Sequence, residues 1–592
     1  MRIEAPWLSR YRGIPHSIDY PEGSMADMLE ETARRYPDYI AYDFMGTTST
    51  YRQLWADTQL CAKGLAAIGV TKDDRVTVCL PNMPQTVIIF YAINLLGAVA
   101  NMIHPLSSEG EIEFFLKDAD SRVAITLDAF YSRFAAMRRS RRLDTLILTG
   151  VKDYLSPLKK LGFAIKTGRK MQPVPKDADV VYWKDLMEAG KGYEQEAAYG
   201  RLAQDVAAIL YSGGTTGSTK GILLTNLNFN ALGMQTVAMG QCVEAGGTML
   251  AVLPMFHGFG LGICIHCMMI SGCKCILIPK FTPDSFADLV RKKRPNYIAG
   301  VPTLYEAMLR NETMEDVDLS CLKGVFVGGD SMSVELKRRF DAFLQEHHSS
   351  TVLREGYGTT ECVTASCLTP SDEYREGSIG LPFPDTLYKI VQPQTIDALP
   401  YRQEGEICIS GPTVMKGYVN QPEETANALR KHDDGRIWLH TGDLGMMDED
   451  GFVYFRQRLK RMIISSGYSI YPSQLENVLD AHPQVSMSCV VGVPDDYRVQ
   501  KVKAFVVLKK GVSPSEALRE DILQHCRKHI AKYAMPYDIE FRESLPQTKV
   551  GKIAYTILEA EEKGKYEREK ALGPGDENED VVDARQPLRY RI

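Results

Sequence analysis

The sequence predicts an α/β fold in which strands and helices alternate around a largely parallel sheet. Residues 75–80 and 123–127 have the apolar patterns of strands, and residues 108–116 between them have helical periodicity. Repeated alternation of this kind is typical of βαβ units, whose strands run parallel. A chain of 592 residues also exceeds what one hydrophobic core usually organises, so we expect more than one domain.

The N-terminal elements can be placed in order from their periodicity. Residues 25–35 put their apolar side chains on one helical face. Thr50 and Gln53 have the spacing of a capping box and predict the start of a second helix. Further along, residues 87–96 are expected to form a helix and residues 98–102 a strand.

Composition and charge are those of an ordinary globular protein. Hydrophobic residues make up 44% of the chain and charged residues 24%, and the formal charge of -6 shows no bias towards nucleic acid or anionic lipid. The 13 cysteines lack the spacing of a disulfide framework, and the N-terminal residues lack the apolar core of a signal peptide. We therefore expect a cytoplasmic protein that does not bind nucleic acid.

Two segments bear on membrane contact. The longest apolar stretch, residues 87–103, contains Asn94 and Asn101 and is shorter than a membrane span of about 20 residues, so a buried helix is expected. Residues 158–170 carry several lysines and arginines around a short apolar face. We interpret them as a solvated surface segment, which leaves at most peripheral contact with the inner face of a membrane.

A loop rich in glycine and hydroxyl side chains follows the apolar run 206–210. Glycines allow backbone N–H groups to turn towards an anion, hydroxyls donate to phosphate oxygens, and a lysine supplies charge. Lys220 is preceded by Thr219 and followed by Gly221, so the loop is not a Walker A motif. We predict a phosphate-binding loop, with a flexible surface turn as the alternative, over the residues Ser212, Gly213, Gly214, Thr215, Thr216, Gly217 and Lys220.

Two later strands end in glycines. Residues 325–330 and 352–361 each combine an apolar run with glycines at its carboxyl end, where open parallel sheets bind ligands. Tyr357 could stack on a flat base, Thr360 could donate to phosphate, and Glu361 could hold Mg²⁺. Alternatively, Glu361 could be a favourable acid in the first turn of a helix.

His257 and Asp443 each allow two interpretations. His257 lies in an aromatic and glycine-rich turn that could line an apolar ligand pocket or pack in the core with a satisfied imidazole. The Asp443 carboxylate, next to Gly442, could accept hydrogen bonds from ribose hydroxyls or form a turn. The cysteines at 264–275 are interpreted as buried thiols rather than zinc ligands.

Five motifs in order resemble those of the adenylate-forming superfamily. They are Tyr-Ser-Gly-Gly-Thr-Thr-Gly at 211–217, Tyr-Gly-Thr-Thr-Glu at 357–361, Thr-Gly-Asp at 441–443, Arg458, and Pro-Gln-Thr-Lys-Val-Gly-Lys at 546–552. The resemblance runs from about residue 25 to about residue 560 and is closest to bacterial fatty-acid CoA ligases. It implies an acyl-CoA synthetase.

The resemblance assigns roles to single positions. It places the β- and γ-phosphates on residues 212–220, Mg²⁺ on Thr215 and Glu361, and the α-phosphate on Thr360. The acyl pocket falls at His257, and Lys552 matches the catalytic lysine, whose ammonium bridges the attacking carboxylate and the phosphate. The adenine and ribose contacts fall on Gly328, Gly356, Tyr357, Gly358, Asp443 and Arg458.

The resemblance also implies a division into domains. Residues 1–459 would bind ATP and the acid, and residues 460–562 would form a small mobile α/β domain that carries Lys552. In the family this domain swings about a hinge, here Lys460, and admits CoA. Residues 563–592 form a charged tail that we expect to be disordered.

We therefore expect an ATP- and Mg²⁺-dependent ligase that joins a carboxylic acid, most simply a medium- or long-chain fatty acid, to CoA. Two alternatives stay open: an acyl-AMP ligase that loads the pantetheine of a carrier protein, and a nucleotide-binding regulator that has lost catalysis. The sequence leaves open the chain length of the acid and whether the protein forms a homodimer. Thr219, in place of the family's common proline, and Val499-Gln500, in place of Gly-Glu, depart from the pattern.

Overall fold

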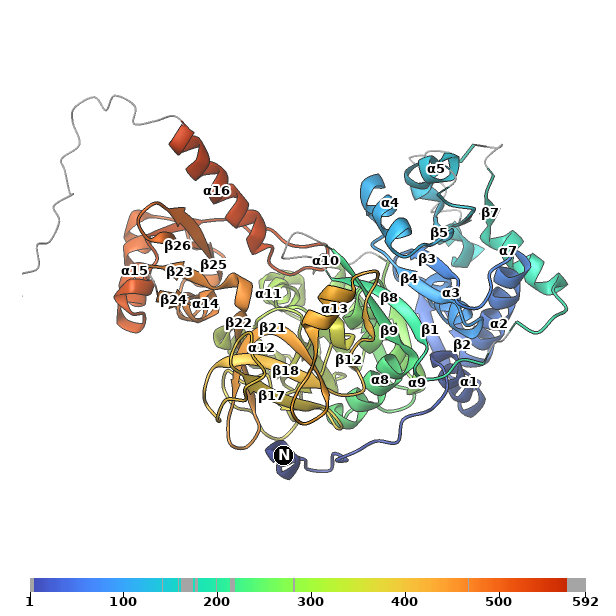
Figure 1. Cartoon of the computed structure of the whole chain (residues 1–592), viewed down its shortest axis with the longest axis horizontal. Coiled ribbons are helices and arrows are strands. Elements are labelled where there is room, and N and C mark those ends of the chain that lie inside the picture. The colour runs from blue at the N-terminus through green and yellow to red at the C-terminus, as the bar shows by residue number, and fades with distance from the viewer. Residues whose placement is uncertain are drawn as a thin grey trace, which may run out of the picture.

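The computed structural model shows a large N-terminal domain and a small C-terminal domain, from which the last helix projects (Figure 1). The structure describes residues 5–140, 142–157, 159–160, 174–175, 179–197, 200–212, 219–279, 283–466 and 468–571. No helix in these ranges is long and apolar enough to cross a membrane.

The first sheet of the large domain is mostly parallel, as the alternation predicts. Its order is β16-β15-β14-β13-β12-β10-β11-β1-β2, and only its edge strands β2, β15 and β16 pair antiparallel. The strands are β1 (Ile40–Phe44), β2 (Thr47–Thr50), β10 (Thr248–Ala251), β11 (Lys274–Leu277), β12 (Tyr297–Gly300), β13 (Gly324–Val327), β14 (Leu353–Tyr357), β15 (Cys367–Leu368) and β16 (Leu381–Pro382).

The second sheet has a parallel centre and an antiparallel edge. Its order is β19-β9-β8-β4-β3-β5-β6-β7, in which β8 and β9 form an antiparallel pair. The strands are β3 (Arg75–Cys79), β4 (Val99–Met102), β5 (Val123–Leu127), β6 (Thr145–Thr149), β7 (Val181–Tyr182), β8 (Val206–Ser212), β9 (Lys220–Thr225) and β19 (Gly417–Tyr418).

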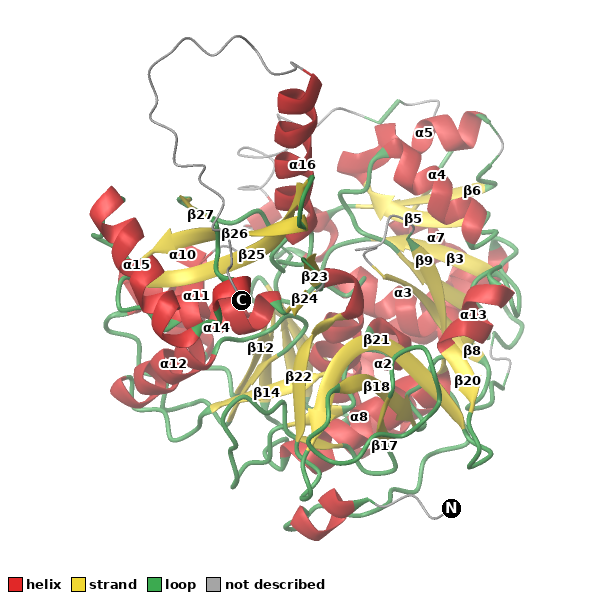
Figure 2. Cartoon of the chain, turned by 60° about the vertical axis from the view of Figure 1, so that its left-hand side comes forward, coloured by secondary structure: helices red, strands yellow, loops and turns green. Residues whose placement is uncertain are grey.

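Helices pack around both sheets (Figure 2). Thr50 Oγ1 accepts from the Gln53 N–H at the start of α2, as the capping-box spacing predicts, and α3 is buried over nearly its whole length. The helices are α1 (Met25–Arg35), α2 (Tyr51–Ala67), α3 (Pro84–Leu95), α4 (Glu109–Asp118), α5 (Tyr131–Arg139), α7 (Trp183–Gly192), α8 (Asn226–Gly240), α9 (Met268–Ile270), α10 (Pro283–Lys293), α11 (Pro302–Arg310), α12 (Val334–Glu346) and α13 (Pro422–Ala428). One core joins α3 and α8 to both sheets.

A third, antiparallel sheet completes the large domain. It has the order β17-β18-β21-β20, with β22 paired to β21 by a hairpin. Its strands are β17 (Leu387–Val391), β18 (Gly405–Ser410), β20 (Leu429–Lys431), β21 (Ile437–Met447) and β22 (Val453–Arg458). β18 is buried along most of its length, so it lacks the alternation by which an antiparallel strand is recognised.

The small domain has a sheet and a hydrophobic core of its own. A short 3₁₀ turn, η8 (Leu459–Arg461), connects it to β22. Gln500, a departure from the family pattern, accepts the Ile464 N–H with its Oε1 at 2.9 Å inside this domain. The elements are β23 (Ile463–Ser465), β24 (Tyr468–Ile470), β25 (Val485–Asp495), β26 (Val499–Leu508), β27 (Asp538–Phe541), α14 (Pro472–Asp480), α15 (Glu516–His529) and α16 (Tyr555–Ala571).

The expectation of disorder from residue 563 onwards is wrong for residues 563–571. They form the last turns of α16, where the Lys565 ammonium lies 2.6 Å from Glu562 and the Lys570 ammonium lies 2.7 Å from Asp496 of the small domain. Lys565 thus pairs within the helix, and Lys570 pairs with a residue outside it. The charge composition of the segment does not reveal these pairs. Residues 572–592 lie outside the described residues.

Buried His266 should make the large domain sensitive to acid. It lies in the π-helical segment η5 (Phe259–Cys267), where its Nδ1 accepts from the Tyr91 hydroxyl and its Nε2–H donates to Asn230, each at 3.0 Å. Burial lowers the pKa of His266 to about 3, against about 6.5 in an unfolded chain. The unfolded state therefore binds more protons between these values, and the free energy of unfolding falls as the pH falls.

We expect His266→Gln to flatten this dependence by up to about 1.4 kcal/mol per pH unit below pH ~6. Calorimetric melting of the wild type and the variant at several pH values measures the difference. Equal changes in melting temperature with pH in both proteins would contradict the assignment.

Candidate functional site

The predicted crevice lies at the carboxyl ends of β13 and β14. Two of its glycines permit close backbone packing: a Cβ at Gly328 would lie 2.9 Å from the Gly356 carbonyl oxygen, and one at Gly358 would lie 2.2 Å from the Thr364 carbonyl oxygen. Thr360 begins the 3₁₀ turn η7 (Thr360–Cys362), which follows the end of β14. The two glycines therefore let the main chain pack closely at the strand ends.

Asp443 of β21 lies buried between two polar side chains of the site. Its Oδ2 accepts from the Tyr357 hydroxyl at 2.8 Å, and its Oδ1 lies 3.4 Å from Nε of Arg458, its cross-strand partner on β22. Within the described ranges, Oδ1 accepts no hydrogen bond. Burial holds the pKa of Asp443 above its usual value, although Arg458 acts in the opposite direction. A buried acceptor of this kind fits a hydroxyl donated by a ligand.

Lys552 reaches this crevice from the small domain. Its loop is a tight turn in which the Thr548 N–H donates to the Lys552 carbonyl at 2.7 Å and Gly551 adopts a φ of +81°. The Lys552 side chain runs beside Gly329, where a Cβ would lie 3.3 Å from Lys552 Cε. Burial lowers the pKa of Lys552, while Asp330 opposes the shift. The structure thus brings Lys552 to the strand ends that carry Gly328 and Gly356.

Three contacts hold the Lys552 loop against the large domain. The Thr303 hydroxyl donates to the Gly551 carbonyl at 2.6 Å, and the Ile553 N–H donates to Asp330 Oδ2 at 3.1 Å. The Lys549 ammonium bonds both carboxylate oxygens of Glu111 on α4, at 2.6 and 2.8 Å. All three contacts are polar, so water can take the place of each when it breaks.

Glu361 and Lys220 both contact Tyr418 of β19. Glu361 Oε1 accepts from the Tyr418 hydroxyl of β19 at 2.9 Å, and the Lys220 ammonium lies 4.8 Å from the centre of the same tyrosine ring. Lys220 also pairs with Glu424 of α13. Through Tyr418, the structure places a carboxylate and an ammonium beside one another.

The glycine loop itself falls mostly outside the described residues. Gly213, Gly214, Thr215, Thr216 and Gly217 belong to the omitted stretch 213–218. Ser212 and Lys220 are described, and they face each other across the antiparallel pair of β8 and β9. The loop therefore connects two adjacent strands next to Tyr418.

His257 lies in the turn before η5. Its Nδ1 accepts from the Phe259 N–H at 3.2 Å, and burial together with the Lys552 charge lowers its pKa to about 3. The imidazole is therefore neutral at physiological pH. His257 is not among the residues that line the apolar pocket that extends inward from the crevice.

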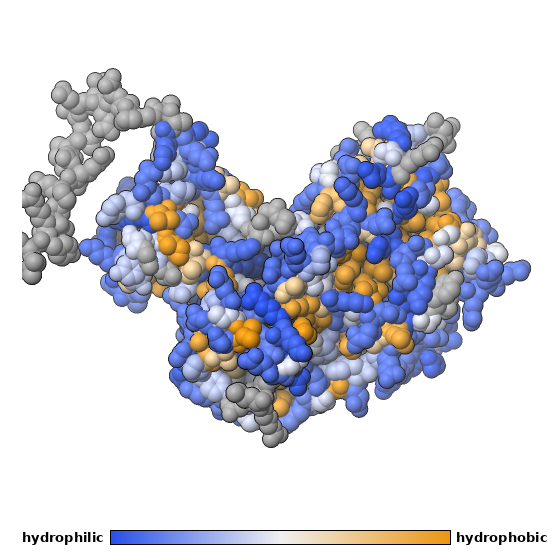
Figure 3. Space-filling view, viewed as in Figure 1, coloured by the Kyte–Doolittle hydropathy of each residue, from blue (hydrophilic) through white to orange (hydrophobic). Residues whose placement is uncertain are grey.

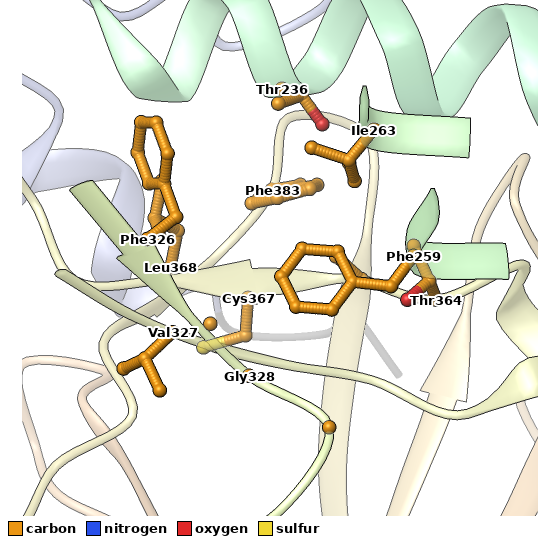
Figure 4. Close-up of a pocket in the computed structure, with 13 residues that line it drawn as sticks. Thr236, Phe259, Ile263, Phe326, Val327, Gly328, Thr364, Cys367, Leu368 and Phe383 are labelled. Atoms are coloured by element: carbon orange, nitrogen blue, oxygen red, sulfur yellow. The ribbon is translucent and has the colours of Figure 1, made fainter. Parts of the chain in front are cut away.

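A largely apolar pocket extends inward from the crevice (Figure 4). Gly328 and Val327 lie at one end, and Thr236 of α8 and Ile263 lie at the other. Its lining residues are Thr236, Phe259, Ile263, Phe326, Val327, Gly328, Gly329, Gly356, Thr364, Ala365, Cys367, Leu368 and Phe383.

Several residues of the site could not be identified from the sequence. Tyr418, Asp330 and Glu111 carry no motif signal, and each meets its partner across more than 50 residues of chain. Local periodicity does not report such pairs. Figure 3 shows a hollow in the surface between the small domain and the large domain.

Comparison with protein families finds two matches. Residues 29–419 match the family described as AMP-binding enzyme. Residues 474–552 match the family described as AMP-binding enzyme C-terminal domain. The matched ranges cover the crevice strands in the large domain and the Lys552 loop in the small domain.

Similar proteins span the whole described fold. A long-chain-fatty-acid–CoA ligase of Bacillus subtilis is 37% identical over 570 residues, which are 95% of this chain and 99% of the ligase. The ATP-bound structure of MatB from Rhodopseudomonas palustris is 27% identical, with a TM-score of 0.78, over 91% of this chain and 99% of MatB. A Mycobacterium tuberculosis fatty acyl CoA synthetase is 26% identical, with a TM-score of 0.66, over 92% and 99%.

Proposed function

Because the chain belongs to the AMP-binding enzyme family, we propose that it is an ATP-dependent acid–CoA ligase acting through an acyl-adenylate. In the first step a carboxylate oxygen of the acid attacks the α-phosphorus of ATP. The bond from that phosphorus to the bridging oxygen breaks, and pyrophosphate leaves with the electron pair. The observation that carries the proposal is the docking of Lys552 beside Gly329 at the strand ends.

Lys552 is suited to assist this attack. The acid and the α-phosphate are both anionic, and their repulsion is the main obstacle to reaction. An ammonium held in a partly buried site acts more strongly on such charges than one in water. Asp330 and Asp443 help to keep Lys552 charged, although burial lowers its pKa.

The remaining site residues fit the parts of ATP. Asp443 Oδ1, which lacks a donor within the described ranges, can accept from a ribose hydroxyl. The carboxylate of Glu361, partly exposed and oriented by Tyr418, would hold Mg²⁺, with Thr215 as the second ligand suggested by the sequence. Bound Mg²⁺ would neutralise charge on the phosphate oxygens.

In the second step the CoA thiol attacks the acyl carbonyl carbon, the thiol proton is lost, and AMP leaves. Lys552 would have to withdraw to admit the thiol, by a movement of the domain 460–562 about Lys460. The polar contacts of Thr303, Asp330 and Glu111 with the loop suit this, because each can be exchanged for hydration.

We propose a medium- or long-chain fatty acid as the substrate. The pocket begins beside the Lys552 site at Gly329 and runs between aromatic and aliphatic side chains to Thr236 on α8. The relative in Bacillus subtilis is named a long-chain-fatty-acid–CoA ligase. Residues 300–303 are not among the lining residues, and Thr303 holds the Lys552 loop.

Thr236→Trp should shorten the accepted chain. The indole would fill the end of the pocket at α8 and displace about two methylenes, each of which contributes about 0.8 kcal/mol when buried. We expect kcat/KM for hexadecanoate to fall at least about tenfold relative to that for octanoate. Thr236→Ser is the matched control and should keep the wild-type ratio. An unchanged ratio in the tryptophan variant would exclude this pocket as the chain site.

The alternatives differ in the acceptor and in catalysis. A carrier-protein ligase would release AMP faster with a carrier pantetheine than with CoA, and a regulator that has lost catalysis would release none. The docked Lys552 and the buried Asp443 favour a working enzyme. A panel of fatty and aromatic acids, each offered with CoA and with a carrier protein, separates these functions when AMP release is followed. Aromatic acids as the better substrates would refute the fatty-acid assignment.

A further inference from the structure

A bulge in β21 carries Asp443 into the site. His440 pairs with Cys408 and Leu444 with Glu406, so β21 advances four residues where β18 advances two. Residues 441–443, between these two pairs, are therefore out of register with β18. Gly442 at the centre adopts a φ of +70°, which residues with a Cβ rarely adopt. The position of Asp443 thus depends on what holds this bulge.

Buried Glu406 closes the bulge from the neighbouring strand. Its Oε1 accepts from the Gly442 N–H at 3.0 Å, and its Oε2 accepts from His440 Nδ1–H at 2.9 Å. The Thr441 hydroxyl adds a bond to the Ile407 carbonyl at 2.7 Å. Burial by itself would raise the pKa of Glu406, but the hydrogen bond from His440 leaves the pKa below its usual value. The carboxylate is therefore ionised and serves both partners.

Two histidines continue this contact away from the site. The Nε2 atoms of His432 and His440 lie 2.9 Å apart, within hydrogen-bond distance, and the Lys389 ammonium lies 3.3 Å from His432 Nδ1. Lys389 also pairs with Asp434 at 2.9 Å, and the His432 ring stacks on Trp438. An ammonium can only donate, so His432 accepts at Nδ1 and donates from Nε2. His440 then accepts at Nε2 and donates from Nδ1 to Glu406.

A metal at the same place is the competing interpretation. The ligand atoms of Cys408, His432 and His440 all lie within 4.8 Å of one another. A metal would need the lone pairs of both Nε2 atoms and would replace the hydrogen bond that joins the two rings. It would also put a second cation beside Lys389. The complete chain of donors and acceptors favours the hydrogen-bonded form.

We propose that Lys389, His432, His440 and Glu406 form a one-directional hydrogen-bond relay that fixes the bulge at Gly442 and so positions Asp443 for the nucleotide ribose. These four are positioning residues, because they act on the ligand through Asp443. The inference rests on the proposed function, since it concerns the ribose contact.

Glu406→Gln tests the direction of the relay. The carboxamide can still accept from Gly442, but its NH₂ then faces His440 Nδ1. To accept from this NH₂ group, His440 must take the other tautomer, and His432 must then do the same. The Nδ1–H of His432 would point at the Lys389 ammonium, so two donors would face each other. We expect the dissociation constant for ATP, measured by calorimetry, to rise about tenfold. Glu404→Gln, which changes an exposed glutamate just before β18, is the matched control and should bind as the wild type does.

The double variant Lys389→Gln/Glu406→Gln separates a relay from a merely structural role. A glutamine at 389 can accept from the reversed His432 and donate to Asp434, so the chain is matched again. We expect the double variant to bind ATP within about threefold of the wild type, and Lys389→Gln alone to do the same. A double variant as weak as Glu406→Gln, or weaker, would overturn the inference.

Nitrogen chemical shifts of labelled histidines give a readout that does not depend on ATP. The relay predicts opposite tautomers for His440 in the wild type and in Glu406→Gln, and unchanged tautomers would overturn it. Stoichiometric zinc binding lost in Cys408→Ser would overturn it in favour of the metal. If the wild type binds no ATP, the proposed function fails, while the histidine shifts still decide the relay.

Discussion

Lys552→Ala is expected to reduce acyl-adenylate formation by about 10²–10³-fold, because it removes the positive charge beside the reacting carboxylate and phosphate. Thioester formation from preformed acyl-adenylate and CoA should stay within about threefold of the wild type, since the proposed second step proceeds after Lys552 has withdrawn. Acid-dependent exchange of pyrophosphate into ATP measures the first step, and release of AMP from synthetic acyl-adenylate measures the second.

Lys549→Ala is the matched control for this experiment. It removes an ammonium from the same loop that bonds Glu111 on the surface and does not line the crevice. We expect a loss of only a fewfold in the exchange rate, typical of an exposed ion pair of about 0–1 kcal/mol. Two outcomes would contradict the assigned role of Lys552. One is an equal loss of exchange rate in Lys549→Ala and Lys552→Ala. The other is an equal loss of adenylate formation and thioester formation in Lys552→Ala.

Asp443→Asn is expected to raise the KM for ATP about 10–100-fold, because a charge-assisted hydrogen bond to a hydroxyl becomes a neutral one. The KM for the fatty acid should change little, since Asp443 does not line the apolar pocket. Steady-state kinetics with each substrate varied in turn separate the two constants.

The variant also changes the charge balance of the site. Asparagine can still accept from the Tyr357 hydroxyl, but it no longer neutralises Arg458. Asp397→Asn, at an exposed position of the same domain, controls for the loss of a carboxylate and should behave as the wild type does. If the KM values for ATP and for the fatty acid rose together, Asp443 would be needed for the structure of the site rather than for the ribose contact.

The sequence predicts the parts of the fold in which local pattern and tertiary structure agree. The strand patterns at 75–80 and 123–127 became β3 and β5 of a parallel sheet, because strands buried on both faces have short apolar runs. Strand β18 was not predicted, because burial removes the alternation of apolar and polar residues in it, and the bulge that carries Asp443 interrupts the pattern of β21.

The residues of the candidate site likewise divide into those that local sequence indicates and those that it does not. Local chemistry suggested a phosphate loop, strand-end glycines and two interpretations of Asp443, whereas Lys552 could be singled out only through the family resemblance. Tyr418 and Glu406 were beyond reach, because their roles depend on partners supplied by other elements: Glu361 in η7 for one, and Gly442 in β21 for the other. Such pairs exist only after the chain has folded.

Attack of the acid carboxylate on the α-phosphorus of ATP is tested most directly by isotope transfer. A fatty acid labelled with ¹⁸O in both carboxylate oxygens is supplied with ATP and CoA, and the nucleotide products are analysed by mass spectrometry. We expect AMP that carries one ¹⁸O atom from the acid. Unlabelled AMP, or ADP with the label in inorganic phosphate, would contradict it.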